Sequence, residues 1–302
     1  MLKGLSLFII IILLTGCSKE VDVTIPSLER SMVVYSYNTV NDSIFFLKLS
    51  STANMYDTIY PQINDAIVIV SSDNMIDTLN YIDSSEIYFS QTIAIKDEVE
   101  LEIVKYPYKT IQASEVVPEK INLIECSAIP NAGIDTDGFI YSEVTIRFRD
   151  IAGMTNFFEI VLSEDIKGEE PFTIFSEDPS IKNEDYFPNT MLSPYPVSLP
   201  FKDILFDGRE QTITIRYDAP LLISEETIIP YQKIYVHFRS VTENYFKYKT
   251  SLIIQENAKN GDIIYGMSEP VEVFTNILNG YGIFSVYQSE IIEIEMPEVI
   301  VK

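Results

Sequence analysis

The sequence predicts a mainly β protein with two antiparallel β-sandwich (Ig-like) domains, of which the second carries one helix and a long irregular excursion. From Met32 onward, short segments rich in β-branched and aromatic residues alternate with clusters of Asn, Asp and Ser, as in strands joined by turns. No long helical pattern separates the early segments, which favours antiparallel pairing. The 302 residues are 46% hydrophobic, so the chain is long and apolar enough for more than one core.

The N-terminal segment predicts a lipoprotein signal. Lys3 provides a short basic region, and an apolar region of ten residues follows it. A transmembrane helix needs about 20 apolar residues, so this region is too short to span a bilayer and is typical of a secretion signal. Its ending, Leu-Thr-Gly-Cys at 14–17, resembles the bacterial lipobox, which implies cleavage before Cys17 and diacylation of its sulfur. We therefore expect a signal peptide over 1–16, a lipid (palmitate) anchor on Cys17 and a tether over 17–26.

Residues 27–118 are predicted to form the first sandwich. The segment 99–103, Val-Glu-Leu-Glu-Ile, alternates apolar and acidic residues, which places the two kinds on opposite faces of a strand. Ser-Ser-Asp-Asn at 71–74 lies between two apolar runs and predicts a hairpin turn. Pro118 marks the predicted boundary, so the second, C-terminal domain is expected over 119–302.

Residues 164–200 differ in composition from the strands around them. They hold four acidic pairs and six of the 15 prolines. Proline at that density breaks helices and excludes a central strand, so we expect a long surface excursion. Because prolines lower the entropy of ordering and aromatic rings provide contact area, the excursion predicts a partner-contact loop; a solvated acidic loop is the alternative. The aromatic residues predicted to contact a partner are Phe172, Phe175, Tyr186, Phe187 and Tyr195.

One helix is predicted over 240–257. Ser240 and Glu243 have the spacing of a capping box, which favours a helix start at Ser240. Asn260-Gly261 provides a left-handed end. The apolar residues that recur at helical spacing, and that should pack on a sheet, are Val241, Tyr245, Tyr248 and Leu252.

Several segments carry a family resemblance. The clearest are HFRSVTENYFKYKTSLIIQ at 237–255 and SEPVEVFTNILNGYGIFSVY at 268–287. Together with the lipobox, Ile-Pro at 25–26 and the MVVYSY strand, they resemble a Bacteroidota lipoprotein family catalogued as domain-of-unknown-function family 4249. The resemblance implies two-domain β-rich surface lipoproteins, often associated with TonB-dependent outer-membrane transporters, and it assigns no catalytic residues. It implies a lipid-anchored position at the outer membrane and leaves open whether the protein is on the cell surface or the periplasmic face.

The charge balance argues against nucleic acid as a partner. The chain has 21 Lys and Arg against 45 Asp and Glu, which gives a formal net charge of −24. Such a charge repels phosphate backbones and also disfavours binding to an anionic membrane surface.

Few residues of the sequence indicate a catalytic or metal-binding site. His237 is the sole histidine, and it lies between Tyr235 and Arg239 on the face opposite the apolar residues. This placement predicts a surface or inter-domain histidine rather than a catalytic base.

Cys126 lies in an apolar strand pattern, which predicts a packed, inert thiol. One histidine and one further cysteine leave no ordinary zinc site, so we expect no metal and no cofactor. Asp-Thr-Asp-Gly at 135–138 predicts a turn, with an irregular calcium site as the alternative.

These observations favour a non-enzymatic binding or accessory lipoprotein that acts with a TonB-dependent transporter. An exported hydrolase with a carboxylate site is one alternative, and it would require two carboxylates about 5–9 Å apart in a closed cleft. A structural or adhesive surface protein is the other alternative, because a sandwich fold does not determine function.

Overall fold

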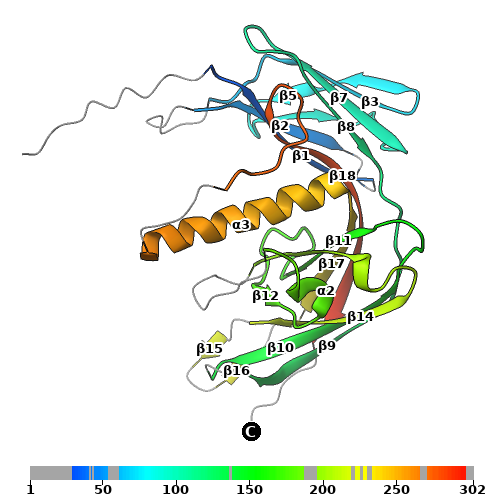
Figure 1. The fold of residues 1–302 in the computed structure, drawn as a ribbon, viewed down its shortest axis with the longest axis vertical. Helices are drawn as coiled ribbons and strands as arrows, with labels where there is room; N and C mark the ends of the chain where they lie inside the picture. The colour runs from blue at the N-terminus through cyan, green and yellow to red at the C-terminus, as the bar shows by residue number, and fades with distance from the viewer. Residues whose placement is uncertain are drawn as a thin grey trace, which may run out of the picture.

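The computed structural model describes residues 29–296 except 41, 43, 54–60, 136–137, 187–195, 219–221, 225–226, 230–232 and 266–270. The predictions for residues 1–28, including the signal, the tether and Cys17, lie outside the described residues. The described chain is mainly β, as predicted, and its strands form several sheets (Figure 1). The strands of the N-terminal half are β1 (Met32–Thr39), β2 (Phe45–Ser51), β3 (Ile67–Ser72), β4 (Met75–Thr78), β5 (Asn80–Ile82), β6 (Ile87–Ser90), β7 (Glu98–Val104) and β8 (Ile111–Val116).

The second half adds longer strands and the helices. In order, its elements are β9 (Leu123–Ile134), β10 (Ile140–Arg149), β11 (Phe157–Ser163), β12 (Ile174–Phe175), α2 (Pro179–Lys182), β13 (Leu199–Lys202), η1 (Asp203–Leu205), β14 (Glu210–Tyr217), β15 (Leu222–Ser224), β16 (Thr227–Ile229), β17 (Lys233–Val241), α3 (Glu243–Tyr265) and β18 (Tyr281–Glu295). The largest sheet has the order β13-β11-β17-β18-β1-β2-β6-β5, and two four-stranded sheets have the orders β4-β3-β7-β8 and β12-β14-β10-β9.

Strand β18 joins the two halves of the large sheet. Its first part, from Tyr281 to Tyr287, pairs in parallel with β1, and its second part, from Tyr287 to Glu295, pairs antiparallel with β17. Gly282 makes the first pairing close: its φ is +100°, and a Cβ there would lie 1.9 Å from the carbonyl oxygen of Val34. Glycine is thus required where β1 and β18 begin to pair.

The apolar residues form two main cores. The N-terminal core lies between the β18-β1-β2-β6 part of the large sheet and the sheet β4-β3-β7-β8, and the C-terminal core lies between the β13-β11-β17-β18 part and the sheet β12-β14-β10-β9. The predicted boundary at Pro118 falls between these cores. Residues 27–118 do not build the N-terminal core alone, however, since Phe284 and Val286 of β18 complete it. The parallel pairing of the last strand with the first is non-local, so strand patterns along the chain do not reveal it.

The predicted helix exists, but its bounds were wrong. Ser240 belongs to β17, which keeps pairing with β11 and β18 through Val241. The helix starts three residues later because Thr242 provides the cap: its Oγ1 accepts a hydrogen bond from the backbone N of Tyr245 at 3.1 Å. It also continues past Asn260-Gly261 to Tyr265, since one glycine costs only about 1 kcal/mol in a helix.

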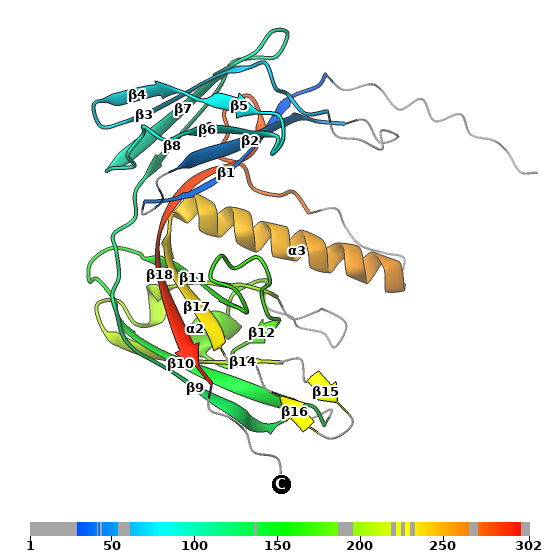
Figure 2. The same ribbon diagram turned by 180° about the vertical axis from the view of Figure 1, so that it is seen from behind.

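Helix α3 packs against β18, β11 and β13 through its first turns (Figures 1 and 2). Tyr245 and Phe246 are buried there, whereas Tyr248 and Leu252 are half-buried. The predicted stripe is therefore packed at its N-terminal end and partly exposed beyond it. In both views the helix leaves the junction between the N-terminal strands and the C-terminal strands and extends outward.

Candidate functional site

A groove of about 680 Å³ lies where the outer face of sheet β4-β3-β7-β8 meets the first turn of α3. Strand alternation explains its wall: in β7, Val99, Leu101 and Ile103 point into the N-terminal core. On β7 and β8, Glu100, Glu102 and Ser114 point outward. Asn244 from α3 and Asn276 from the segment before β18 line its other side. We call this hollow, bounded by Glu100, Glu102, Ser114, Asn244 and Asn276, the junction groove.

The junction groove combines negative charge with apolar surface. Ser71 Oγ donates to Glu100 at 3.2 Å, and Gln112 Nε2 donates to Glu102 at 3.1 Å, so both carboxylates are held on the wall. Ile76 and Leu278 border the groove with 76% and 59% of their surface exposed. Carboxylates beside exposed apolar side chains suit a ligand that carries both positive charge and apolar groups.

Glu115 holds Asn244 and Asn276, two of the residues that line the junction groove. It is 4% exposed, and its Oε1 accepts hydrogen bonds from Asn244 Nδ2 and Asn276 Nδ2, each at 2.7 Å. Burial raises the pKa of Glu115, although these hydrogen bonds act in the opposite direction. Asn276 also bonds both backbone groups of Phe284, at 2.7 and 3.0 Å. The network ties β8, α3 and β18 together, so the two halves of the protein meet in a defined geometry.

A second hollow of about 520 Å³ adjoins the junction groove and shares Ser114 and Asn244 with it. Its lining includes Glu119 and Glu243 and the segment from Met154 to Phe158. The two hollows together place carboxylates from both halves of the protein along one surface.

A buried charge cluster lies under α3, on the face of the large sheet that points away from the C-terminal core. Glu159 is fully buried; Arg239 Nη1 lies 2.7 Å from its Oε2, and Lys249 Nζ lies 3.3 Å from its Oε1. Tyr245 donates its hydroxyl to the same Oε2 at 2.5 Å. Arg239 is paired with Glu159 across neighbouring strands, and its guanidinium also lies over the ring of Tyr287.

The cluster keeps Glu159 ionised. Burial on its own raises the pKa of this carboxyl, but the charges of Lys249 and Arg239 and the hydrogen bonds of Tyr245 and Arg239 outweigh it and lower the pKa to about 2. Sequence reasoning missed this residue because Phe158 and Ile160 mark the core face of β11, and Glu159 then falls on the face that strands usually expose. The helix that covers this face is what buries it. The cluster thus fastens α3, and with it one side of the junction groove, to the large sheet.

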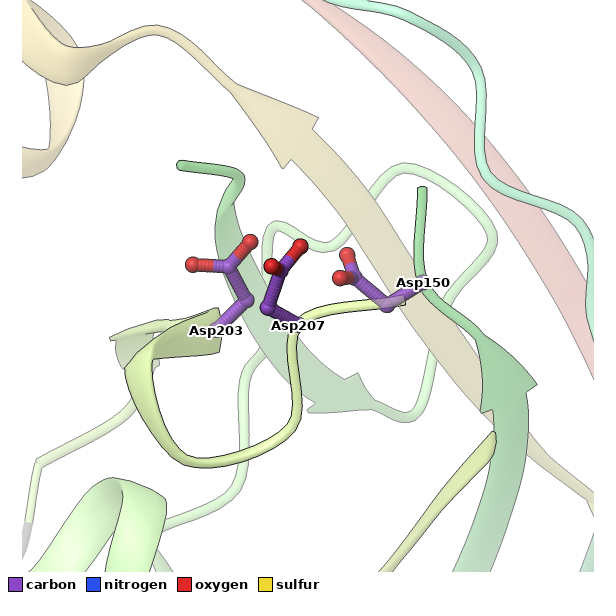
Figure 3. A group of neighbouring side chains, drawn as sticks. All are labelled: Asp150, Asp203 and Asp207. Atoms are coloured by element: carbon purple, nitrogen blue, oxygen red, sulfur yellow. The ribbon is translucent and has the colours of Figure 1, made fainter. Parts of the chain in front are cut away.

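Three aspartates gather beside η1. Asp150 follows β10, Asp203 begins η1 and Asp207 follows η1; one carboxylate oxygen of each lies within 4.8 Å of the others (Figure 3). Such a group can hold a divalent cation. Its oxygens, however, already accept hydrogen bonds: Asp150 from Gly208 N at 2.8 Å, and Asp203 from Asn156 N at 2.9 Å. In this structure the three side chains tie neighbouring loops together.

The predicted turn at 135–138 is present at its described residues. Asp135 accepts a hydrogen bond from the backbone N of Phe139 at 2.7 Å, and its own carbonyl accepts one from Gly138. Gly138 has φ +90°, as such a turn requires. Asp137, which the alternative calcium site would need, lies outside the described residues.

The prediction of a surface or inter-domain His237 was wrong. It is 2% exposed because the segment around Gly168 covers it, and its Nε2 lies 2.9 Å from Ser163 Oγ. Ser163 Oγ also donates to the carbonyl of Asp165 at 2.7 Å, and with its proton in that bond the serine accepts from the imidazole Nε2–H. Burial, and then the charge of Arg239, lower the pKa of His237.

Cys126 is a half-buried free thiol on β9 and packs against the C-terminal core, as predicted. Burial raises its pKa to about 12, which suppresses the reactive thiolate.

The predicted partner-contact aromatics do not form one surface. Phe172 and Tyr186 are 5% and 1% exposed: Phe172 lies in the C-terminal core, and the Tyr186 hydroxyl donates to the carbonyl of Pro200 at 2.8 Å. These two were wrongly predicted, since proline and acid content marks an irregular segment but does not show which of its side chains turn inward. Phe175 is half-buried against the same core, and Phe187 and Tyr195 lie outside the described residues.

Among the described residues, no helix is both long and apolar enough to cross a membrane. No curated protein matches the sequence. Among the solved structures that match are two with weak likeness. One, described as a membrane-anchored protein from Corynebacterium diphtheriae, has a TM-score of 0.21 at 8% identity over 72% of this chain. The other, the BSP domain of a biofilm-associated protein, has a TM-score of 0.19 at 10% identity over 70% of this chain. The match covers 55% of each of those chains, and at these TM-scores the likeness carries no conclusion.

One family model matches most of the chain. Residues 18–291 match a single family model, which spans both cores, the junction groove and the buried charge cluster. The match covers far more than half of the 302 residues and confirms the resemblance to domain-of-unknown-function family 4249. The chain therefore belongs to the family described as Domain of unknown function (DUF4249).

Proposed function

We propose that this protein is an outer-membrane lipoprotein, anchored through Cys17, that binds a basic segment of a TonB-dependent transporter in the junction groove. The observation that carries the proposal is the groove itself: an acidic and partly apolar hollow at the fixed junction of the two cores. Its extension into the second hollow suits an extended polypeptide segment better than an enclosed small molecule. The family resemblance of the sequence, which implies association with such transporters, supports the choice of partner. In this proposal each pair of packed sheets is an Ig-like sandwich.

Charge reversal in the groove tests the proposal. The variant Glu100→Lys with Glu102→Lys should abolish co-purification with a TonB-dependent transporter expressed in the same cells, because like charges then face the basic segment. The control carries Glu98→Lys with Asp83→Lys, two exposed acids outside the lining of the groove. It makes the same change in net charge and should co-purify as the unmodified protein does. Equal retention by both variants would place the contact elsewhere.

The anchor is tested separately. Replacing Cys17 with Ala removes the sulfur that the lipobox assigns for acylation, so the variant should leave the detergent phase in a phase-partition experiment. A variant that stays in the detergent phase would show that the lipid assignment is wrong.

A further inference from the structure

The end of the molecule where the described chain begins carries an unusual surface. The loop between β7 and β8 has the sequence Lys-Tyr-Pro-Tyr-Lys-Thr at 105–110, and Tyr106 at its tip is 90% exposed. This loop lies at one end of the long axis, with β9 and β10 toward the other end (Figures 1 and 2). Exposed aromatic side chains indicate an interaction site where several of them lie on one surface.

The loop is next to the start of the described chain. A hollow of about 250 Å³ is lined by Glu29 and Arg30 from that start, by Tyr108 and Lys109 from the loop, and by Tyr281 from β18. Asn279 Nδ2 donates to the carbonyl of Thr110 at 3.1 Å, which fixes the segment before β18 to the loop. Tyr281 is 53% exposed. Tyr108 is half-buried and packs partly against the N-terminal core. We call the surface formed by Arg30, Tyr106, Tyr108, Lys109 and Tyr281 the tether-end surface.

The composition of the tether-end surface differs from the rest of the chain. The basic residues Arg30, Lys105 and Lys109 lie here together with the acidic residues Glu29 and Asp65, and Lys105 is paired with Asp65, in a chain whose net charge is −24. Tyrosine rings flanked by basic side chains are typical of protein surfaces at the headgroup level of a bilayer. The ring lies among the upper acyl chains, its hydroxyl stays hydrated, and the basic groups reach the phosphates.

The short stretch of chain between Cys17 and Glu29 would keep the tether-end surface close to the bilayer. Twelve residue steps separate Cys17 from Glu29, which is at most about 40 Å of extended chain and about 20 Å as a flexible coil. A lipid on Cys17 would thus present the tether-end surface to the headgroups at an effective concentration in the millimolar range. Weak interfacial contacts that would not hold a free protein are then sufficient.

We propose that the tether-end surface docks on the headgroup region of the phospholipid bilayer, so that the anchored protein stands with its N-terminal core against the membrane. The inference rests on the proposed lipid anchor at Cys17. Its consequence is a fixed orientation: the junction groove is held near the membrane, and the C-terminal core projects away from it.

Because the sequence contains no tryptophan, the fluorescence of a single introduced tryptophan can be measured without background from other tryptophans. Tyr106→Trp places a single reporter on the tether-end surface, and Phe139→Trp, at a site 67% exposed in the β9–β10 turn, places one at the far end as the matched control. Each full-length lipoprotein is reconstituted into phosphatidylcholine–phosphatidylethanolamine vesicles, with and without lipids brominated near the headgroup. The reporter at position 106 should lose most of its emission to the brominated lipids and shift to shorter wavelength, while the reporter at position 139 should keep its emission.

Vesicle flotation tests the lipid anchor separately from the docking of the tether-end surface. Protein that does not float with the vesicles refutes the anchor, and with it the proposed function. Protein that floats while the reporter at position 106 is unquenched, or quenched no more than the reporter at position 139, refutes the docking alone. Emission that shifts when a transporter is reconstituted, but not with lipid, also overturns the proposal and identifies a protein as the occupant of this surface.

Discussion

Replacing Glu159 with Gln removes the negative charge that fastens α3 to the large sheet and leaves Arg239 and Lys249 near each other without their carboxylate. The pKa of Glu159 falls from 4.5 to about 2 on folding, and that difference corresponds to roughly 3 kcal/mol of stability at pH 7. Loss of one partner of a buried ion pair costs about 3–5 kcal/mol, in agreement with this value. We expect Glu159→Gln to lower the free energy of unfolding by about 3 kcal/mol at pH 7.

The stability that ionised Glu159 contributes should decrease as the pH falls. The folded pKa is depressed, so the stabilisation is fully present above the unfolded value of 4.5 and is lost as the pH falls toward 2. The difference between the original protein and the variant should therefore be constant from pH 7 to about pH 5 and fall to about half by pH 3.

Urea unfolding followed by far-ultraviolet circular dichroism measures this difference at each pH. Glu293→Gln is the matched control, because Glu293 pairs with Lys233 on the surface of the same sheet and the two side chains are 41% and 48% exposed. It should change the midpoint little at any pH. A difference below about 1 kcal/mol for Glu159→Gln, or one that does not vary with pH, would refute the buried, ionised carboxylate.

Three further predictions concern single contacts. Gly282→Ala should lower the free energy of unfolding by several kcal/mol, because the added Cβ would clash with the backbone of β1. Gly138→Ala is the control: its φ is +90° but the space around it is open, so it should cost about 1 kcal/mol. Equal effects of the two substitutions in chemical unfolding would contradict the close pairing of β1 and β18. Cys126 should be alkylated at pH 8.5 at least about tenfold more slowly in the native protein than in urea, as measured by mass spectrometry; equal rates would show an exposed thiol. Tyr245→Phe removes the hydroxyl that donates to Glu159 and should cost about 2 kcal/mol by urea unfolding, and an unchanged midpoint would contradict that bond.

Local patterns along the chain predicted the elements better than their assembly. The alternation at 99–103 correctly gave both the strand and its buried face, since period-two burial is a local property. The stripe through Tyr245 gave the helix, but Ser240 and Thr242 are both suitable caps, and the choice depends on how far β17 pairs with its neighbours. Such pairing involves residues distant in sequence.

The candidate site lay beyond sequence reasoning for the same reason. The junction groove is assembled from β7 and β8 on one side and from the first turn of α3 and Asn276 on the other, and more than a hundred residues separate the two sides in the sequence. Glu159 and Arg239 are 80 positions apart and become partners only through the register of β11 with β17. By contrast, the acid- and proline-rich composition of 164–200 is visible locally, and it pointed to Phe172 and Tyr186, whose burial depends on the C-terminal core.

Site-specific photo-crosslinking at Ser114 tests the central claim most directly, because this exposed residue borders both hollows of the proposed binding surface. A photoreactive phenylalanine is placed there in cells that express the full chain, and at exposed Thr212 on β14 as the control. Irradiation should join the protein to the TonB-dependent transporter from position 114 and not from position 212. No adduct from position 114, or the same adduct from both positions, would contradict binding in the junction groove.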